Sequence, residues 1–310
     1  MSIIQVASLT KRFRELTAVQ DLSFEVPRGG VYGFLGQNGA GKSTTIRMLL
    51  TLIRPTAGSI RIFGEDLQQQ RSSILRRVGA IIEKPDLYPY LSATDNLRIM
   101  GRLSGLKPTA GELSRQLDRV GLGSRAGSKV KTFSQGMKQR LGIACALLHN
   151  PELVILDEPT NGLDPQGIAD IRNLILHLSR NEGKTVMISS HLLYEVELVA
   201  DSMLIIDKGR KITEGRVSDL LHPADTLVAL RTTDDAAARR QLQASSWAGA
   251  LQTATEDGLL LRLDRNDVPL LNRDLVGLGI QVLSLQPRHS LEDYFFSLTT
   301  PHAHGTADRD

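Results

Sequence analysis

The chain has 310 residues, of which 41% are hydrophobic, so it can form one large domain or a large domain with a small one. Its net charge of +3, from 37 basic and 34 acidic residues, is too small an excess to favour nucleic-acid binding. The single cysteine, Cys145, excludes an intrachain disulfide and is typical of a reducing compartment.

The distribution of apolar residues indicates where in the cell the protein is found. Residues 1–6 lack the basic-then-apolar layout of a signal peptide, and no apolar stretch reaches the length that spans a bilayer. We therefore expect a cytoplasmic protein in which any membrane role depends on a partner.

Short β segments are predicted before residue 36. Residues 4–9 and 22–26 have β-type composition, and residues 27–30 have turn chemistry. Phe13 lies in a polar stretch between these segments. An aromatic side chain exposed there could stack on an adenine ring, or it could pack at the edge of a small sheet. Composition alone favours edge packing.

Residues 36–44 are the most informative stretch of the sequence. They follow the pattern G-x-x-x-x-G-K-S between an apolar run, 31–35, and a helical pattern, 45–50. Glycines let backbone N–H groups converge on an anion, and the following helix N-terminus adds free donors. Lys42 would reach the β- and γ-phosphates, and the Ser43 hydroxyl would bind Mg²⁺. The predicted nucleotide contacts are Gly36, Asn38, Gly39, Ala40, Gly41, Lys42, Ser43 and Thr44. A chance glycine-rich turn would not explain the flanking pattern.

A helical insertion is predicted after the loop. Residues 59–64 alternate as a strand, 72–77 form a polar helix, and 78–82 form a buried strand that ends at Glu83. A proline-containing loop precedes helices at 93–103 and 110–120. Because this block, about residues 84–150, is not needed for a strand–helix–strand crossover, we expect an inserted helical subdomain.

Residues 131–140 form a short polar loop that leads into an apolar helix, 141–148. The free N–H groups of this helix N-terminus make a second potential anion site. Many loop–helix junctions look similar, so this signal is weak by itself.

Two carboxylates stand at the end of the apolar strand 153–156. Open α/β sheets bind ligands at the carboxyl ends of their strands, and adjacent strand residues point to opposite faces. Asp157 therefore suits the Mg²⁺ shell opposite Ser43, and Glu158 suits a general base for an attacking water. The alternative is that both merely cap a strand end.

The remaining elements before residue 215 continue the alternation of strand and helix. A turn at 159–165 precedes a helix, 166–180, with one apolar face, and a buried strand at 184–190 precedes His191. A histidine in this place could be structural or could act on a ligand at the sheet edge. Residues 203–213 are typical of a hairpin.

Taken together, residues 1–215 resemble the nucleotide-binding subunit of an ATP-binding cassette (ABC) transporter. The matching motifs are the Walker A loop at 36–44, the signature loop at 133–137, Walker B with its catalytic Glu at 153–158, the D-loop at 162–164 and the switch histidine at His191. The resemblance implies an α/β P-loop ATPase cassette with an antiparallel β subdomain and an inserted helical subdomain that docks on a membrane partner. It also implies that Phe13 stacks on adenine, in place of edge packing.

The sequence departs from the family pattern in two places. The signature reads FSQGM where LSGGQ is usual, so Ser134 and Gly136 are retained as a hydroxyl and a permissive backbone. Glu83 replaces the usual Gln, which resembles the branch that exports bacitracin, lantibiotics and related antibiotics. A carboxylate cannot donate a hydrogen bond, so beside a γ-phosphate it needs Mg²⁺ or water. We predict that Glu83 contacts the metal shell and helps to signal to the membrane partner.

Residues 216–298 carry none of these motifs. Strands at 226–231, 259–263 and 281–285 and helices at 234–243 and 268–278 suggest a β-α-β-β-α-β-like order in a small α+β accessory domain. Residues 291–298 resemble the terminal helix of many antibiotic-export cassettes. Residues 299–310 form a polar tail that we expect to be disordered.

The resemblance implies ATP-driven closure of a homodimer. ATP and Mg²⁺ would lie between Walker A of one subunit and Ser134 and Gly136 of the other. Glu158 would activate water, His191 would position the γ-phosphate, and Glu83 would signal to a separate permease at the cytoplasmic face of the membrane.

Two other classes compete with this reading. A soluble cassette acting on DNA or ribosomes usually has two cassettes or a long coiled-coil insertion, and the sequence has neither. A P-loop kinase or GTPase would not explain the signature loop or His191. The transported compound cannot be read from this chain, because the permease would bind it.

Overall fold

The computed structural model describes residues 1–220, 226–252 and 258–288. The chain divides into two compact units, Met1–Arg216 and Val217–Asp310. The predicted terminal helix at 291–298 and the polar tail at 299–310 lie outside the described residues.

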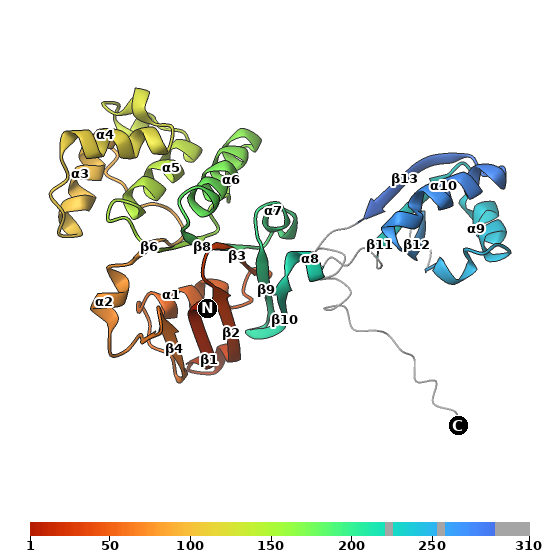
Figure 1. Cartoon of the computed structure of the whole chain (residues 1–310), viewed down its shortest axis with the longest axis horizontal. Coiled ribbons are helices and arrows are strands. Elements are labelled where there is room, and N and C mark those ends of the chain that lie inside the picture. Colours follow the sequence, from red (N-terminus) through yellow and green to blue (C-terminus); the bar gives the residue numbers. More distant parts are fainter. Residues whose placement is uncertain (221–225, 253–257, 289–310) are drawn as a thin grey trace. The chain divides into compact units, whose positions relative to one another are not determined.

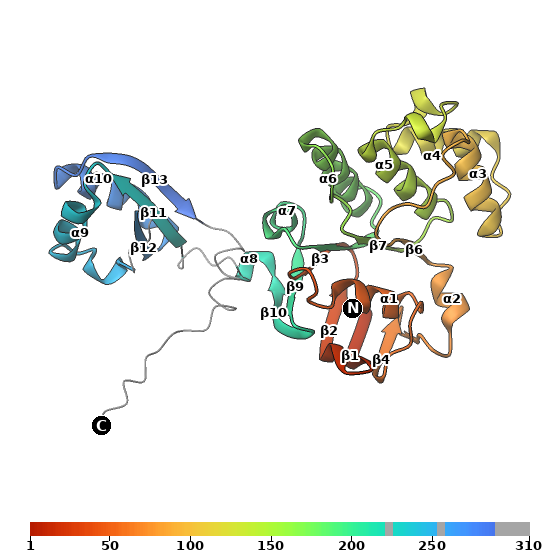
Figure 2. The ribbon, with the colours of Figure 1, turned by 180° about the vertical axis from the view of Figure 1, so that it is seen from behind.

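A six-stranded sheet forms the centre of the first unit (Figure 1, Figure 2). Its strands are β3 (Gly30–Leu35), β6 (Val78–Ile81), β7 (Leu153–Asp157), β8 (Thr185–Ser190), β9 (Ser202–Asp207) and β10 (Arg210–Arg216). In the order β10-β9-β3-β8-β7-β6, neighbouring strands are parallel except β10 and β9. Every residue of β7 and β8 is buried, as expected of parallel strands covered on both faces.

The register of this sheet brings three chain segments to one edge. Leu35 pairs with Ser190, and Asp157 pairs with Ser189, so the carboxyl ends of β3, β8 and β7 lie level. The residues that follow these strands therefore meet at the edge where open α/β sheets bind ligands.

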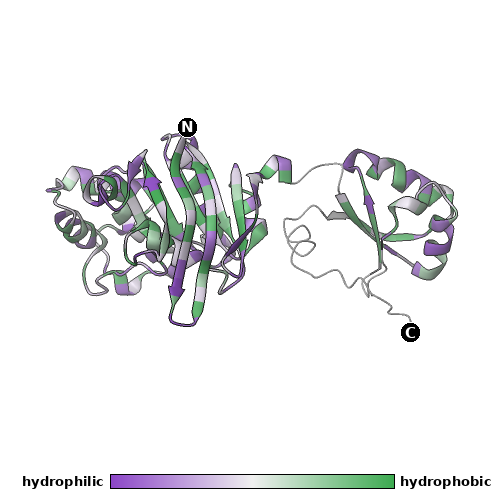
Figure 3. Ribbon diagram, turned by 90° about the horizontal axis from the view of Figure 1, so that it is seen from below, coloured by the Kyte–Doolittle hydropathy of each residue, from purple (hydrophilic) through white to green (hydrophobic). Residues whose placement is uncertain are grey.

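A second, antiparallel sheet shares its core with the first. It consists of β1 (Ser2–Phe13), β2 (Leu16–Pro27), β4 (Ala57–Ile62) and β5 (Glu65–Asp66) in the order β2-β1-β4-β5. Hydrophobic and hydrophilic residues alternate along the long strands β1 and β2 (Figure 3). The ring of Phe24 lies 5.7 Å from that of Phe34 in β3, centroid to centroid. Helix α1 (Lys42–Leu49) contributes Ile46, Met48 and Leu49 to the same buried cluster.

The inserted block is helical and lies together at one end of the first unit, away from the antiparallel sheet (Figure 1, Figure 2). Its helices are α3 (Ala93–Leu103), α4 (Ala110–Arg119) and α5 (Gln135–Ala146). Ser92, Thr109 and Ser134 cap these helices through their side-chain oxygens. Because Ser134 caps α5, this helix begins six residues before the apolar run that predicted it.

The other helices of the described chain are α2 (Arg71–Leu75), α6 (Pro165–Arg180), α7 (Leu193–Glu197) and α8 (Val217–Leu220). Asp164 caps α6, and Pro165 occupies its first turn. No helix in the described ranges is both long and apolar enough to cross a membrane.

The described part of the second unit begins with the short helix α8 and continues as a three-stranded antiparallel sheet with helices α9 and α10. The elements are β11 (Thr226–Thr232), α9 (Asp235–Gln243), β12 (Leu259–Leu263), α10 (Val268–Gly277) and β13 (Val282–Arg288), with strand order β12-β11-β13. The predicted β-α-β-β-α-β order is wrong for these residues, which follow β-α-β-α-β. Residues Ala248–Ala250 form a 3₁₀ turn, and Leu251 makes a single bridge to Leu261, so no fourth strand forms there.

Candidate active site

The glycine-rich loop joins β3 to α1, and its shape requires glycine at two positions. Gly41 has a left-handed backbone with φ of 105°, and a Cβ there would lie 2.6 Å from the carbonyl oxygen of Ala18. A Cβ at Gly36 would lie 2.5 Å from the carbonyl oxygen of Ile206. The loop therefore exposes backbone N–H groups at a helix N-terminus without side chains in the way, an arrangement suited to phosphate.

A pocket of about 480 Å³ opens above this loop. Besides residues of the loop it is lined by Glu158 and by residues that sequence reasoning did not select: Leu16, Thr17, Ala18, Asn161 and Lys208. The β9–β10 turn supports the loop directly, because the N–H of Gly209 donates to the carbonyl of Ala40 at 2.9 Å. Only tertiary packing brings these segments to the loop, so no local signal marks them.

Lys42 is the buried cation of the site, at 5% exposure. Its ammonium donates to the carbonyl of Gly36 at 2.5 Å and lies 3.2 Å from Oε1 of Glu158. A buried lysine is stable only when paired, and here the partners come from the loop and from the end of β7. The structure thus joins the predicted phosphate cation to the predicted general base.

Glu158 and His191 also meet. Nδ1 of His191 lies 2.7 Å from Oε2 of Glu158. Because an ionised carboxylate can only accept, Nδ1 carries the proton, which leaves Nε2 facing away from this contact. Glu158 has a left-handed backbone with φ of 50°, so it leaves the strand direction of Asp157. Lys42, Glu158 and His191 therefore form one connected cluster at the sheet edge.

Asp157 is 1% exposed and has an unusual environment. Its Oδ1 accepts a hydrogen bond from the hydroxyl of Ser189 at 2.5 Å, whereas its Oδ2 is buried with no hydrogen-bond partner among the described residues. A buried carboxylate oxygen needs a partner, so Oδ2 fits Mg²⁺ or a water bound to it.

The donor set is too sparse to hold a metal alone. In the ranges that the structure describes, no group of three or more His, Cys, Asp or Glu side chains could bind one. Mg²⁺ commonly uses one or two carboxylates together with substrate phosphates and water. Asp157 and Ser43, at the start of α1, fit such a shared site.

Glu83 differs from its expected position. Its side chain is 64% exposed and forms an ion pair with Arg47 on α1, and it does not line the pocket. The left-handed backbone at Glu83, φ 58°, marks the end of the β6 region and turns the chain into the following loop. A contact between Glu83 and the metal shell stays a prediction.

Phe13, Ser134 and Gly136 also lie outside the residues that line the pocket. Phe13 is 44% exposed near the β1–β2 turn, with the Lys11 ammonium 4.8 Å from its ring centroid. The ring is therefore partly exposed, and its stacking on adenine stays a prediction. Ser134 is exposed, and its Oγ accepts from the N–H of Met137, so its own proton is available to a ligand.

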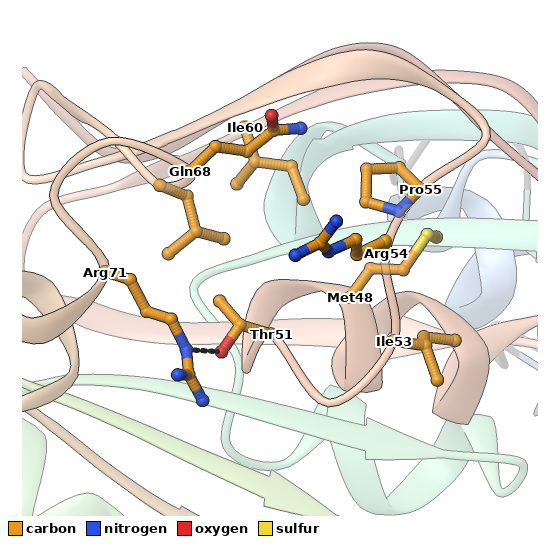
Figure 4. Close-up of a pocket in the computed structure, with 9 residues that line it drawn as sticks. Met48, Thr51, Ile53, Arg54, Pro55, Ile60, Gln68 and Arg71 are labelled. Carbon is orange, nitrogen blue, oxygen red and sulfur yellow. Dashed lines mark hydrogen bonds between the residues drawn. The ribbon is translucent and has the colours of Figure 1, made fainter.

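A second hollow, of about 430 Å³, lies between the end of α1 and β4 (Figure 4). Arg71 donates to the hydroxyl of Thr51 at 2.6 Å on one side of it. None of the predicted site residues lines this hollow, so it is separate from the phosphate loop.

Comparison with known proteins agrees with this geometry. The family model described as "ABC transporter" matches residues 19–161. The bacitracin transport ATP-binding protein BcrA of Bacillus licheniformis is 41% identical over 96% of this chain and 97% of its own length. The lantibiotic transport ATP-binding protein SrtF of Streptococcus pyogenes is 43% identical over 68% of this chain and 90% of its own length.

A solved structure of an ATP-binding subunit of an ABC transporter is 33% identical, with a TM-score of 0.62 over 71% of this chain and 92% of that one. The P-loop cassette fold predicted from the sequence is confirmed, and a repair- or translation-type cassette is not favoured. The chain therefore belongs to the ABC transporter family, among the ATP-hydrolysing subunits that drive transport.

Proposed function

We propose that two copies of this chain bind ATP and Mg²⁺ between them and hydrolyse ATP to drive a separate permease at the cytoplasmic face of the membrane. The observation that carries this proposal is the cluster of Lys42, Glu158 and His191 at one edge of the central sheet. A cation for the phosphates, a carboxylate for water and an imidazole near the γ-phosphate are the groups that this phosphoryl transfer uses.

Glu158 acts as the general base. Its carboxylate takes the proton of the attacking water as the water oxygen approaches the γ-phosphorus. The hydrogen bond from Nδ1 of His191 orients that carboxylate. Because Nδ1 already carries a proton, Nε2 donates to a phosphate oxygen only when the imidazole is protonated.

Ser43 and Asp157 would hold Mg²⁺, and Glu83 would contact its shell. The bound ion neutralises charge on the phosphate oxygens. The buried Oδ2 of Asp157, without a partner in the described chain, supports this assignment.

Ser134 and Gly136 act on the ATP of the partner copy. They cap and begin α5, whose N-terminal N–H groups and dipole favour an anion. Neither residue lines the pocket of its own chain, which supports a site completed by a second copy. Phe13 stacks on the adenine from the same chain as Lys42.

The permease contacts the surface between the ATPase core and the helical subdomain. A hollow of about 810 Å³ lies there, lined by residues of α2, among them Arg71, by Arg76, and by residues 104–106, which follow α3. The loop after Glu83 adds two exposed aromatic side chains, Tyr88 and Tyr90. Movement at Glu83 would reach the permease through this loop.

The transported compound is an antibiotic, a peptide or another amphiphile. This part of the proposal depends on the names of the relatives BcrA and SrtF and on Glu83 in place of Gln. To test it, the full chain is co-purified with its candidate permease, reconstituted in nanodiscs and assayed for phosphate release with bacitracin as the probe. We expect a stimulated rate that Glu158→Gln abolishes. A stable complex that bacitracin and a lantibiotic both leave unstimulated would contradict the substrate class, and failure to bind any permease would contradict the transporter role.

A further inference from the structure

Ser189, the penultimate residue of β8, is completely buried and contacts both acidic residues of the site. Its hydroxyl donates to Oδ1 of Asp157 at 2.5 Å and accepts from the backbone N–H of Glu158 at 2.9 Å. A serine hydroxyl has one proton and two lone pairs, so it can make both bonds at once. One side chain thus joins the end of β8 to the carboxylate of Asp157, the last residue of β7, and to the backbone of Glu158, which follows it.

The hydrogen bond from Ser189 to Asp157 determines which carboxylate oxygen of Asp157 is left for a ligand. Oδ1 is occupied by Ser189, and Oδ2 is left buried without a partner in the described chain. A carboxylate that can rotate would present either oxygen, whereas this one is held in a single orientation. Ser189 therefore leaves Oδ2 as the oxygen that could bind Mg²⁺.

The hydrogen bond from the N–H of Glu158 to Ser189 restrains the backbone of Glu158. A non-glycine residue with φ of 50° is in a sparsely populated region and persists where its surroundings fix it. The backbone hydrogen bond to Ser189 is one such restraint. In this conformation the Glu158 carboxylate reaches both Lys42, at 3.2 Å, and His191, at 2.7 Å.

A buried hydroxyl could instead serve only to satisfy backbone groups, and two neighbours in β8 show that role. Ser190 bonds to the backbone of Leu192, and Thr185 accepts from the N–H of Gly29 at 2.9 Å. Neither contacts a carboxylate in the hydrogen bonds found for the described chain. Ser189 differs because both of its partners belong to the catalytic edge.

We infer that Ser189 is a positioning residue for ATP hydrolysis, which orients Asp157 toward the metal and holds Glu158 in its catalytic conformation. This inference rests on the proposed function, because it assumes that Asp157 binds Mg²⁺ and that Glu158 is the base. Ser189 itself touches neither nucleotide nor water in this account. Its removal should therefore affect metal affinity and turnover rather than nucleotide binding.

The test compares Ser189→Ala with Thr185→Val, a matched control that removes a buried hydroxyl from the other end of the same strand. For Ser189→Ala we expect kcat to fall about 10- to 100-fold, as for losses of groups that orient metal ligands. The affinity for Mn²⁺ in the presence of ADP, measured by EPR, should fall about tenfold. ADP binding in EDTA should be unchanged in both variants, and Thr185→Val should keep wild-type kcat and Mn²⁺ affinity.

A second variant, Ser189→Cys, guards against loss of folding, because it keeps nearly the same volume with a weak donor. It should show the same direction of change at an unchanged thermal midpoint. Wild-type kcat and Mn²⁺ affinity in Ser189→Ala or Ser189→Cys would overturn the inference. If Glu158→Gln retains turnover, the proposed function is wrong. If Glu158→Gln loses turnover while the Ser189 variants behave like Thr185→Val, only the inference about Ser189 is wrong.

Discussion

The first unit, Met1–Arg216, and the second unit, from Val217 onward, both pack helices on a sheet, but their sheets are built differently. The central sheet of the first unit is almost entirely parallel, so β3, β7 and β8 all end at one edge. The described sheet of the second unit is antiparallel, so its neighbouring strands end at opposite edges. Lys42, Glu158 and His191 converge at this edge of the first unit, where the catalytic site is proposed.

The relatives divide in the same way. The match to BcrA covers 96% of this chain, which includes the second unit, whereas the match to SrtF spans 212 residues, close to the length of the first unit. The match to BcrA therefore extends into the second unit, whereas the match to SrtF spans too few residues to cover both units.

The largest effects are expected for core substitutions, which should destabilise one unit without the other. Leu204 and Leu261 are fully buried in the cores of the first and second units, respectively. Replacing either by alanine should lower the free energy of unfolding of its unit by about 2–5 kcal/mol. Differential scanning calorimetry should show that Leu261→Ala lowers one transition while the ATPase rate at 25 °C is retained. A parallel loss of ATPase activity in Leu261→Ala would mean that the units are not independent.

Removal of Lys42, the cation that would bind the phosphates, should have the next largest effect. Lys42→Ala removes charged hydrogen bonds worth about 1.5–3 kcal/mol each, so ATP affinity should fall about 10- to 100-fold by calorimetric titration. Lys184→Met is the control, because Lys184 is also buried but bonds to Asn150 and Pro151, away from the pocket. Equal losses of affinity in the two variants would show that any buried lysine of this unit has the same effect.

Adenine stacking should contribute a smaller amount. Aromatic stacking on a base is worth about 1–3 kcal/mol, so Phe13→Ala should weaken ATP binding while Phe13→Tyr should not. Leu16, which lines the pocket without an aromatic ring, provides the comparison. If Leu16→Ala weakens ATP binding more than Phe13→Ala, the adenine lies on β2 and the assignment of Phe13 is wrong.

The smallest effect on stability is expected at Glu83. Its ion pair with Arg47 is exposed, and such pairs contribute about 0.2–1 kcal/mol. Glu83→Gln should therefore fold normally but change the ATPase rate or its stimulation by the permease, because it removes the carboxylate that we predict to contact the metal shell. Arg47→Ala separates the two roles, since it removes the pair and keeps the carboxylate. Unchanged rate and coupling in Glu83→Gln would contradict the predicted role.

Local patterns explain what could be predicted from the sequence. The loop around Lys42 follows from glycine spacing between an apolar strand and a helix, and the order of strands predicted that Glu158 and His191 would share its edge. The bond between Ser189 and Asp157 could not be predicted, because it depends on the register of β7 and β8, which packing decides. The pairing of Glu83 with Arg47 likewise depends on tertiary structure.

The order of strands and helices in the second unit shows a different limit of prediction from the sequence. Its individual strands and helices were predicted close to their observed bounds, whereas their order as a motif was not. The three predicted strands at 226–231, 259–263 and 281–285 already account for the described sheet, and residues Ala248–Ala250 form a 3₁₀ turn.

The central claim is that Glu158, held by Lys42 and His191, is the base for ATP hydrolysis in the first unit. The direct test is ATP hydrolysis by Glu158→Gln in the full chain, with ATP binding and oligomeric state measured on the same sample. We predict a fall in kcat of about 10²- to 10⁴-fold, retained ATP affinity and accumulation of an ATP-bound dimer by light scattering. Turnover at the wild-type rate would contradict the account.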